Sequence, residues 1–381
     1  MLIAYVATVD GSPRGGFKSL AATMEATREK LDSVLLHRGT LAGTVHDVPT
    51  IEMPKRGFLA NVRGNPIRLA QASAGFIREN VFAWRVLRKL HPDIVHCNDL
   101  DAYFGVRLAA AALRIPVVLH VRDIPRRPMV TVAAAKRCAG AVAVSGRVAE
   151  ALNGSSKDCH VVTVYNPVLS SPDVVRDRKV ARSALGLDKL EGPIVGYVAA
   201  VEPRKGQLEF IKAAIPALTA LGAHVVFMGP RPNREYEVRC RQALSLSERC
   251  EEVVTWRGYV PDADKFLAAF DVVALFSTSE GLPRVALEAG RALRPIVITD
   301  VGGAREAVVD GATGFVVPAG DAKMFADRVC ELVRNADLAS RMGAAAEAYV
   351  ARTFAPSRTV AQLLQLYTAV RSLPPSRCSH L

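Results

Sequence analysis

The chain has 381 residues, of which half are hydrophobic, 23% are charged and only 6% are aromatic. This composition is typical of a globular protein rather than a disordered or fibrous one, and the length suits two domains better than one. The formal net charge of +12 favours acidic partners such as a nucleoside diphosphate or an anionic lipid surface, although an ordinary solvated basic surface explains it equally well. No zinc-finger spacing or aromatic RNA-binding signature accompanies the charge, so we expect no nucleic-acid partner.

The seven cysteines are odd in number and form no C-x-x-C pair, which favours a reducing compartment over a disulfide framework or a structural zinc site. The apolar run Leu2–Val6 is too short for the core of a signal peptide. No run of 18 apolar residues occurs, so we expect no membrane span. These features together predict a cytoplasmic protein.

The first part of the chain alternates short β-branched runs with longer helical patterns. The strands expected there are Leu2–Val6, Ser33–His37, Asp93–Cys97, Pro116–Val121, Ala141–Ser145 and Val161–Tyr165. Helical patterns cover Gly16–Leu31, Phe76–Leu90 and Ala102–Leu113. This βαβ order predicts a domain over residues 1–170, built on a parallel sheet with helices on both faces.

Residues 171–193 interrupt the pattern with prolines, serines and a charge run, and they predict a linker with a short helix at Val180–Leu185. A second βαβ series over 194–355 has expected strands at Ile194–Ala199, His224–Met228, Val253–Trp256, Asp271–Phe276, Pro295–Thr299 and Gly314–Val317. Its first helix contains Pro216, which we expect to kink or split it. Helical patterns close the chain at Ala322–Asn335, Ala336–Arg352 and Ser357–Ser372, and residues 356–373 are expected to return to the first domain. The predicted fold class is α/β, with two doubly wound, Rossmann-like domains facing a cleft.

Ligands of doubly wound sheets bind at the carboxyl ends of the strands, and a pair of glutamates follows one such strand. Glu280 lies in the loop after Asp271–Phe276, Pro283 suits the first turn of the next helix, and Glu288 lies one to two turns into it. Carboxylates bind diols well because they accept two hydrogen bonds, and the free N–H groups of a helix start suit a diphosphate. The spacing alone does not distinguish this binding role from a purely structural one, in which Glu280 caps the helix and Glu288 is a surface residue.

The segment that holds the two glutamates resembles the E-x7-E signature of retaining glycosyltransferases of family 4, which have the GT-B fold. The resemblance extends over about 130 residues in colinear order, through Arg257–Val260, Phe270–Val273, Pro295–Thr299, Val301–Glu306 and Asp310–Pro318. In the family the first glutamate contacts donor-sugar hydroxyls and the second holds the ribose, which assigns these roles to Glu280 and Glu288. The resemblance also places donor-binding positions at Gly258, Val260, Gly281, Leu282 and Pro283.

Lys205 follows the first strand of the second series, in Pro203-Arg204-Lys205-Gly206. It opens a helix, so its cation and the helix dipole can both face a diphosphate and stabilise a leaving phosphate. A surface lysine is the alternative, but the order of the motifs favours the functional role. Family members carry an arginine five residues before the lysine, where this chain has Ala200, and whether Arg204 replaces that arginine stays open. A second departure is Leu293, where relatives usually carry glycine.

The first domain resembles the family more loosely. Gly15-Gly16 resembles the family's N-terminal Gly-Gly, which brings backbone N–H groups near the donor phosphate. His120 ends the strand Pro116–Val121 where the family often has a histidine next to the anomeric centre, although a lone histidine is commonly structural. His96 and Asp99 end another strand and are candidates for the acceptor side. The basic, amphipathic stretch Lys55–Arg88 predicts either peripheral contact with an anionic membrane or an ordinary basic surface.

The resemblance implies a retaining glycosyltransferase that uses a UDP- or GDP-sugar donor and an acceptor that is a sugar, a lipid-linked glycan or a small molecule. Its expected catalytic residues are Lys205, Glu280 and His120, and its donor contacts include Gly16, Arg204 and Glu288. We expect no cofactor and no metal, because the D-x-D strings at Asp99–Asp101 and Asp262–Asp264 lack the context of a metal site. Two alternatives are a catalytically inactive scaffold of the same fold in a glycan-assembly complex, and a GT-B epimerase or phosphorylase.

Overall fold

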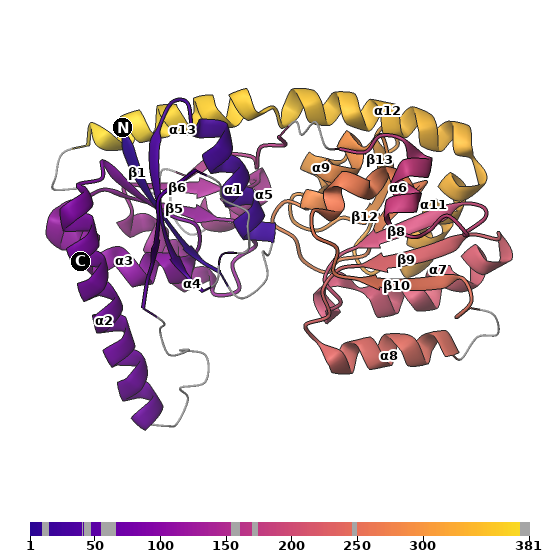
Figure 1. Cartoon of the computed structure of the whole chain (residues 1–381), viewed down its shortest axis with the longest axis horizontal. Coiled ribbons are helices and arrows are strands. Elements are labelled where there is room, and N and C mark those ends of the chain that lie inside the picture. The colour runs from indigo at the N-terminus through magenta and orange to yellow at the C-terminus, as the bar shows by residue number, and fades with distance from the viewer. Residues whose placement is uncertain are drawn as a thin grey trace. The chain divides into compact units, whose positions relative to one another are not determined.

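The computed structural model describes residues 1–9, 15–39, 41, 47–54, 66–153, 161–169, 174–245 and 250–373 (Figure 1). The chain forms two compact units: Met1–Leu169 together with Pro356–Leu381, and Ser170–Ala355. Over these described ranges, no helix combines the length and the apolar character that a bilayer crossing requires.

The first unit is a seven-stranded parallel sheet in the order β3-β2-β1-β4-β5-β6-β7. Its strands are β1 (Leu2–Thr8), β2 (Asp32–Arg38), β3 (Thr50–Glu52), β4 (Ile94–Cys97), β5 (Val117–Val121), β6 (Gly140–Ala143) and β7 (Val161–Thr163). Its helices are α1 (Gly15–Thr27), α2 (Pro66–Leu90), α3 (Leu100–Leu113), α4 (Pro128–Arg137), α5 (Gly146–Asn153) and α13 (Pro356–Arg371). The strand order reverses between β1 and β4, so the ligand edge of this sheet lies where these two strands end.

The six strands expected from the sequence are present in this sheet, with ends that differ by one or two residues. Three further elements were not expected: β3, α4 and α5. The strand β3 has three residues and none of them is buried, so it carries no alternation of apolar and polar residues. The helix α2 begins at Pro66, ten residues earlier than its apolar pattern indicates.

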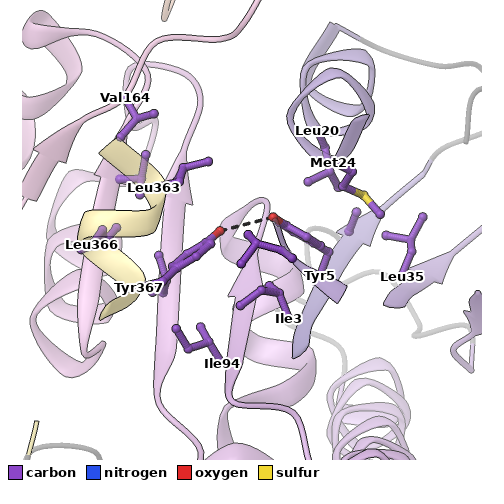
Figure 2. Close-up of a cluster of buried hydrophobic side chains, with 14 of the residues drawn as sticks. Ile3, Tyr5, Leu20, Met24, Leu35, Ile94, Val164, Leu363, Leu366 and Tyr367 are labelled. Atoms are coloured by element: carbon purple, nitrogen blue, oxygen red, sulfur yellow. Dashed lines mark hydrogen bonds between the residues drawn. The ribbon is translucent and has the colours of Figure 1, made fainter. Parts of the chain in front are cut away.

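The C-terminal helix α13 completes the core of the first unit (Figure 2). Leu363, Leu366, Tyr367 and Val370 repeat at the spacing of one helix face. This face packs in a cluster that also contains Ile3, Tyr5, Leu20, Met24, Ile94, Val118 and Val142. The unit therefore needs residues from both ends of the chain to bury its sheet.

The second unit is a six-stranded parallel sheet in the order β10-β9-β8-β11-β12-β13. Its strands are β8 (Ile194–Val198), β9 (His224–Met228), β10 (Val254–Gly258), β11 (Val272–Leu275), β12 (Ile296–Thr299) and β13 (Gly314–Val317). Its helices are α6 (Arg178–Ala184), α7 (Gln207–Ala220), α8 (Arg234–Ser245), α9 (Arg284–Arg291), α10 (Ala304–Ala307), α11 (Ala322–Arg334) and α12 (Ala336–Thr353), with 3₁₀ turns η2 (Pro203–Lys205) and η3 (Ala263–Ala269). Here the strand order reverses between β8 and β11.

Residues 174–193, expected as a linker, pack into the second unit. The helix α6 carries Arg178 and Arg182 one turn apart, and both guanidinium groups reach Asp271, at 2.7 and 2.8 Å. The same carboxylate accepts a hydrogen bond of 2.7 Å from the backbone N–H of Ile194 at the start of β8. Asp271 thus ties α6 to the sheet, because one carboxylate satisfies two arginines and a strand end.

Pro216 was expected to kink or split its helix, and a split is excluded because α7 runs without interruption over Gln207–Ala220. A proline inside a helix costs about 3 kcal/mol. The buried face of α7 carries Leu208, Ile211, Ile215 and Leu218, each at most 5% exposed. Burial of such side chains contributes about 1.5–3 kcal/mol each, so tertiary packing outweighs the proline.

Leu293 follows α9 with φ = +57°, in the left-handed region. The family that the sequence resembles usually carries glycine here, and the backbone of Leu293 adopts a conformation that favours glycine although the side chain is larger. The turn is fixed by its neighbours, because a Cβ built on Gly343 of α12 would lie 2.1 Å from the Leu293 carbonyl oxygen. The left-handed conformation costs a branched residue about 1–2 kcal/mol.

We therefore expect Leu293→Gly to stabilise the second unit by about 0.5–1 kcal/mol, because the relief of strain exceeds the larger chain entropy of glycine in the unfolded state. Thermal unfolding followed by circular dichroism should show the second-unit transition rising by about 1–4 °C. Leu293→Ala is the control, since alanine keeps the strained φ and should give no gain. A lower transition temperature for the glycine variant than for the alanine variant would contradict the strain.

Candidate functional site

Lys205 and Glu280 meet at the carboxyl ends of β8 and β11, the adjacent strands between which the sheet order reverses. The Lys205 Nζ lies 2.5 Å from Glu280 Oε1, and the Ser277 hydroxyl donates to the same oxygen at 2.6 Å. Glu280 is 6% exposed. A carboxylate this deeply buried requires a paired cation and hydrogen-bond donors, and it has both here.

Glycines bring the loops of this site together. Gly206 has φ = +65°, and a Cβ there would lie 1.9 Å from the Phe276 carbonyl oxygen. Gly302 has φ = +53°, and a Cβ there would lie 1.6 Å from the carbonyl oxygen of Glu280. Any larger residue at either position would push the loop after β8 or after β12 away from the loop that carries Glu280.

A buried tyrosine holds the backbone of Lys205. The Tyr197 hydroxyl donates to the Lys205 carbonyl oxygen and accepts from the Phe276 N–H at 2.9 Å. The Thr278 N–H also donates to the Arg204 carbonyl oxygen, at 2.9 Å. These bonds join the η2 turn to the loop after β11, so the lysine and the glutamate are fixed relative to each other.

Arg204 brings a second cation to the same carboxylate. Its Nη1 lies 3.8 Å from Glu280 Oε2 and donates to the Ser279 carbonyl oxygen at 3.0 Å, while Nη2 contacts Glu202 Oε1 at 3.1 Å. Ala200, the position of the family arginine, lies earlier in the same loop, where its carbonyl oxygen accepts from the Gln207 side chain at 2.8 Å. The structure therefore places a guanidinium at the site although Ala200 contributes no charge.

Glu288 makes a separate contact. It lies on α9 and pairs with Arg284, whose Nη2 is 2.8 Å and Nε 3.1 Å from Glu288 Oε1. Pro283 is the residue immediately before the helix, and Gly281, Leu282 and Pro283 are buried beneath the start of α9. The two glutamates thus flank one helix start, with only Glu280 contacting Lys205 among the contacts of the described residues.

Gly258 and Val260 lie at the end of β10, on the edge of the sheet. Gly258 has φ = +74°, and its carbonyl oxygen accepts from the Gly229 N–H at 2.8 Å. The guanidinium of Arg231 comes within 3.4 Å of a Cβ built on Gly258. Sequence reasoning missed Arg231, although it follows the end of β9. At about 4.8 Å per strand, β10 lies roughly 14 Å from β11, so these positions suit the far end of an extended ligand.

In the first unit, Gly16 lies in the first turn of α1, and residues 10–14 of the preceding loop lie outside the described residues. A Cβ on Gly16 would lie 3.7 Å from Arg122 Cδ. Arg122 follows β5 and donates to the side-chain oxygens of Asn98 and, at 2.7 Å, Asn166. Sequence reasoning missed Arg122, and its position two residues after His120, directly after the end of β5, was the available signal.

His120 is 2% exposed, and its Nδ1 lies 3.2 Å from His96 Nε2. Burial lowers the pKa of His120 well below its ordinary value, and the charge of Arg122 adds to the effect. Burial and Arg122 also lower the pKa of His96, to about 3. Both imidazoles are therefore neutral at physiological pH. The His120 Nε2 is buried and has no hydrogen-bond partner among the described residues.

The acceptor-side expectation for Asp99 is not supported, because Asp99 is the N-cap of α3. Its carboxylate accepts from the N–H groups of Ala102 at 2.7 Å and Thr8 at 3.3 Å. His96, the other such candidate, is 0% exposed. Within the described part of the chain, no three histidine, cysteine, aspartate or glutamate residues gather in a way that would hold a metal ion.

Comparison with known proteins gives two family matches. Residues 192–335 match the model described as glycosyl transferases group 1, and residues 40–169 match the model described as glycosyltransferase family 4. Together the two models cover more than half of the chain, and the boundary between them falls near the boundary of the two compact units.

The chain is 34% identical over 205 residues to a D-inositol 3-phosphate glycosyltransferase of Nocardia farcinica, a match covering 51% of this chain and 44% of that protein. It is 28% identical over 356 residues to a protein of the same name from Streptomyces scabiei, covering 84% of this chain and 79% of the relative. In its matches to most of the curated relatives, the chain spans about half the length of the relative.

Among solved structures, Anabaena HepE in complex with UDP and glucose superposes with a TM-score of 0.79 at 21% identity, covering 97% of this chain and 99% of HepE. Sucrose-phosphate synthase from Thermosynechococcus elongatus superposes with a TM-score of 0.74 at 19% identity, covering 96% and 98% of the two chains. These likenesses confirm the expected α/β class with two Rossmann-like domains of the GT-B type. With both halves matched and the fold shared, the chain belongs to the group 1 glycosyl transferases of glycosyltransferase family 4.

Proposed function

We propose that this protein transfers a sugar from a UDP- or GDP-sugar to an acceptor hydroxyl, with retention of the anomeric configuration. The observation that carries the proposal is the cluster of Lys205, Arg204 and Glu280 at the carboxyl ends of β8 and β11. A doubly wound sheet binds its ligand at this point, and two cations beside a carboxylate suit a diphosphate linked to a polyol.

The chemistry needs groups that stabilise the departing diphosphate. The bond between the anomeric carbon and the diphosphate oxygen breaks, and a bond to the acceptor oxygen forms on the same face of the sugar. The leaving phosphate oxygen takes the acceptor proton, so no second carboxylate is required as a base. Lys205, with Arg204 beside it, stabilises the negative charge that develops on that oxygen. Glu280 Oε2 accepts hydrogen bonds from donor-sugar hydroxyls, while Oε1 stays bonded to Ser277.

The donor extends along the sheet edge in this proposal. Glu288 accepts hydrogen bonds from the ribose diol, the buried segment Gly281–Pro283 presents the start of α9 to the diphosphate, and Gly258 and Val260 contact the base. A complex of HepE with UDP and glucose supports a UDP-sugar donor by analogy of fold. In this proposal Lys205 and the helix start supply the positive charge that faces the diphosphate.

Lys205→Met and Glu280→Gln should each lower kcat by about 100-fold or more, because each removes a group that acts on the charged transition state. Release of free nucleotide from a panel of UDP- and GDP-sugars, with product analysed by NMR for anomeric configuration, is the measurement. Lys212→Met is the matched control, since Lys212 is an exposed lysine on α7. Full transfer by both site variants, or an inverted product, would sink the proposal.

Glu288→Gln should raise the KM for the nucleotide sugar about tenfold and change kcat little, because a ribose contact is equal in the ground and transition states. Steady-state kinetics with the preferred donor separates the two constants. Glu331→Gln is the control, because Glu331 also pairs with a helical arginine, Arg328, at 2.7 Å in the same unit. A loss confined to kcat would instead place Glu288 at the reacting centre.

An inactive scaffold of the same fold is the alternative, and Ala200 is the residue that favours it. Calorimetry with UDP and GDP discriminates between them, because a scaffold that has lost the donor site binds neither. The guanidinium of Arg204 at Glu280 supports the enzyme, since the cation missing at Ala200 is supplied nearby. Leu293 carries no weight for the scaffold, because it lies after α9 and affects backbone strain.

We further propose that the first unit contacts an anionic membrane surface through α2, as a peripheral protein at the cytoplasmic face. Ile77 and Val81 lie one turn apart and are 59% and 46% exposed. Beside them is a hollow of about 440 Å³ lined by Pro54, Ala74, Ile77, Arg78, Val81, Phe82 and Arg85. Exposed apolar side chains between arginines suit a surface of anionic headgroups and acyl chains. The basic residues at 55–65 lie outside the described residues.

The double variant Arg78→Gln/Arg85→Gln should weaken binding to vesicles of phosphatidylglycerol by roughly 30-fold, since each arginine near an anionic surface contributes about 1 kcal/mol. Co-sedimentation with anionic and with neutral vesicles is the measurement. The double variant Arg28→Gln/Arg147→Gln, at two exposed arginines of the same unit, is the control. Equal binding to both kinds of vesicle would contradict the proposal.

A further inference from the structure

Four buried polar side chains of the first unit form a continuous chain. The Tyr5 and Tyr367 hydroxyls are 3.4 Å apart (Figure 2), the Tyr367 hydroxyl lies 2.7 Å from His96 Nδ1, and His96 Nε2 lies 3.2 Å from His120 Nδ1. Tyr5, His96 and Tyr367 are 0% exposed, and His120 is 2% exposed. The chain ends at His120 Nε2, which has no partner among the described residues.

The protons of this chain have only two consistent arrangements, because every member is neutral. Burial raises the pKa of both tyrosines, and it lowers the pKa of both histidines with help from the charge of Arg122. A neutral imidazole has one N–H and one lone pair. If Tyr367 donates to His96 Nδ1, then His96 Nε2–H donates to His120 Nδ1, and His120 Nε2 carries a proton. If the bonds run the other way, His120 Nε2 carries a lone pair.

The distance and the acidity of the groups select the first arrangement. A phenol is a stronger acid than a neutral imidazole N–H, and an imidazole nitrogen is a stronger base than a phenol oxygen. A separation of 2.7 Å suits an O–H donor, whereas N–H donors more often lie at 2.9–3.0 Å. The hydroxyl of Tyr367 therefore donates to His96 Nδ1, which fixes the hydrogens of both imidazoles.

We propose that Tyr367 of α13 is a positioning residue that, through His96, holds His120 in the Nε2–H tautomer, so that His120 acts as a hydrogen-bond donor and not as a base. The inference rests on the proposed function only for its kinetic test, because the tautomer itself is a property of the first unit. The C-terminal helix α13, which starts at residue 356, then has two roles: it completes the core, and it fixes the tautomer of His120 through Tyr367.

The tautomer is measured without any substrate. In the wild-type protein labelled with ¹⁵N-histidine, the Nε2 of His120 should have the shift of a protonated ring nitrogen and Nδ1 that of an unprotonated one, with His120→Leu giving the assignment. Tyr367→Phe keeps the buried ring and removes the donor, so both imidazoles should become mixtures of tautomers. Tyr5→Phe is the matched control and should leave the tautomer unchanged, because its bond to Tyr367 is long.

A His120 that is protonated at Nδ1 in the wild type would overturn the proposal, and so would a single Nε2–H tautomer in Tyr367→Phe. The wild-type spectrum decides even where a variant does not fold. Neither result depends on turnover, so a failure of the glycosyltransferase proposal stays distinguishable from a failure of this one.

The donor role has its own kinetic test. His120→Gln retains an N–H donor at similar reach and should keep activity within about tenfold of wild type, whereas His120→Leu should lose about 100-fold. Tyr367→Phe should lower kcat about two- to tenfold, in line with the fraction of the competent tautomer that remains. Equal losses in the glutamine and leucine variants would contradict the proposal, because the N–H donor of glutamine would then restore nothing.

Discussion

The buried carboxylate of Glu280 is the group on which the ligand edge of the second unit depends. An isolated carboxylate at this depth would cost several kcal/mol, so it must be paired, and Lys205, Ser277 and Arg204 supply the partners from two loops. The loops reach it only because Gly206 and Gly302 allow backbone contacts that no other residue permits. One electrostatic requirement thus explains both the charged residues and the glycines of three strand ends.

The same requirement explains how this chain departs from the arginine–lysine pair of its family. Ala200 removes the charge from the loop after β8, yet Arg204 returns a guanidinium to the same carboxylate from the η2 turn. The cation comes from a different position in the sequence but reaches the same place, because the η2 turn directs both Arg204 and Lys205 to Glu280. Arg204 and Lys205 therefore act together as the cationic partner of Glu280.

In the first unit, the constraint is the pairing of buried hydroxyl and imidazole groups. The apolar face of α13 completes the core of this sheet, and Tyr367 on that face brings a second buried hydroxyl beside that of Tyr5. That hydroxyl is satisfied by His96, which in turn contacts His120, so the need to pair buried polar groups extends from a packing helix to a strand end. The packing of α13 and the position of the His120 ring are thus coupled by the same hydrogen bonds.

Much of this molecule follows from local sequence. Alternating β-branched runs and helical periodicity predict six strands in each sheet, all of which are present, and the colinear motifs predict Lys205 and Glu280 at strand ends, where they are found. Local signals fail for β3, α4 and α5, and for Pro216, because short elements carry little periodicity and because burial of α7 outweighs its proline. Tertiary structure alone decides the contacts between distant residues: Asp271 with α6, Arg204 with Glu280, and Tyr367 with His96, 271 residues away. The physical reason is that propensity acts over a few residues, whereas the pairing of buried charges and hydroxyls is settled only by which groups the packed sheets bring within hydrogen-bond distance.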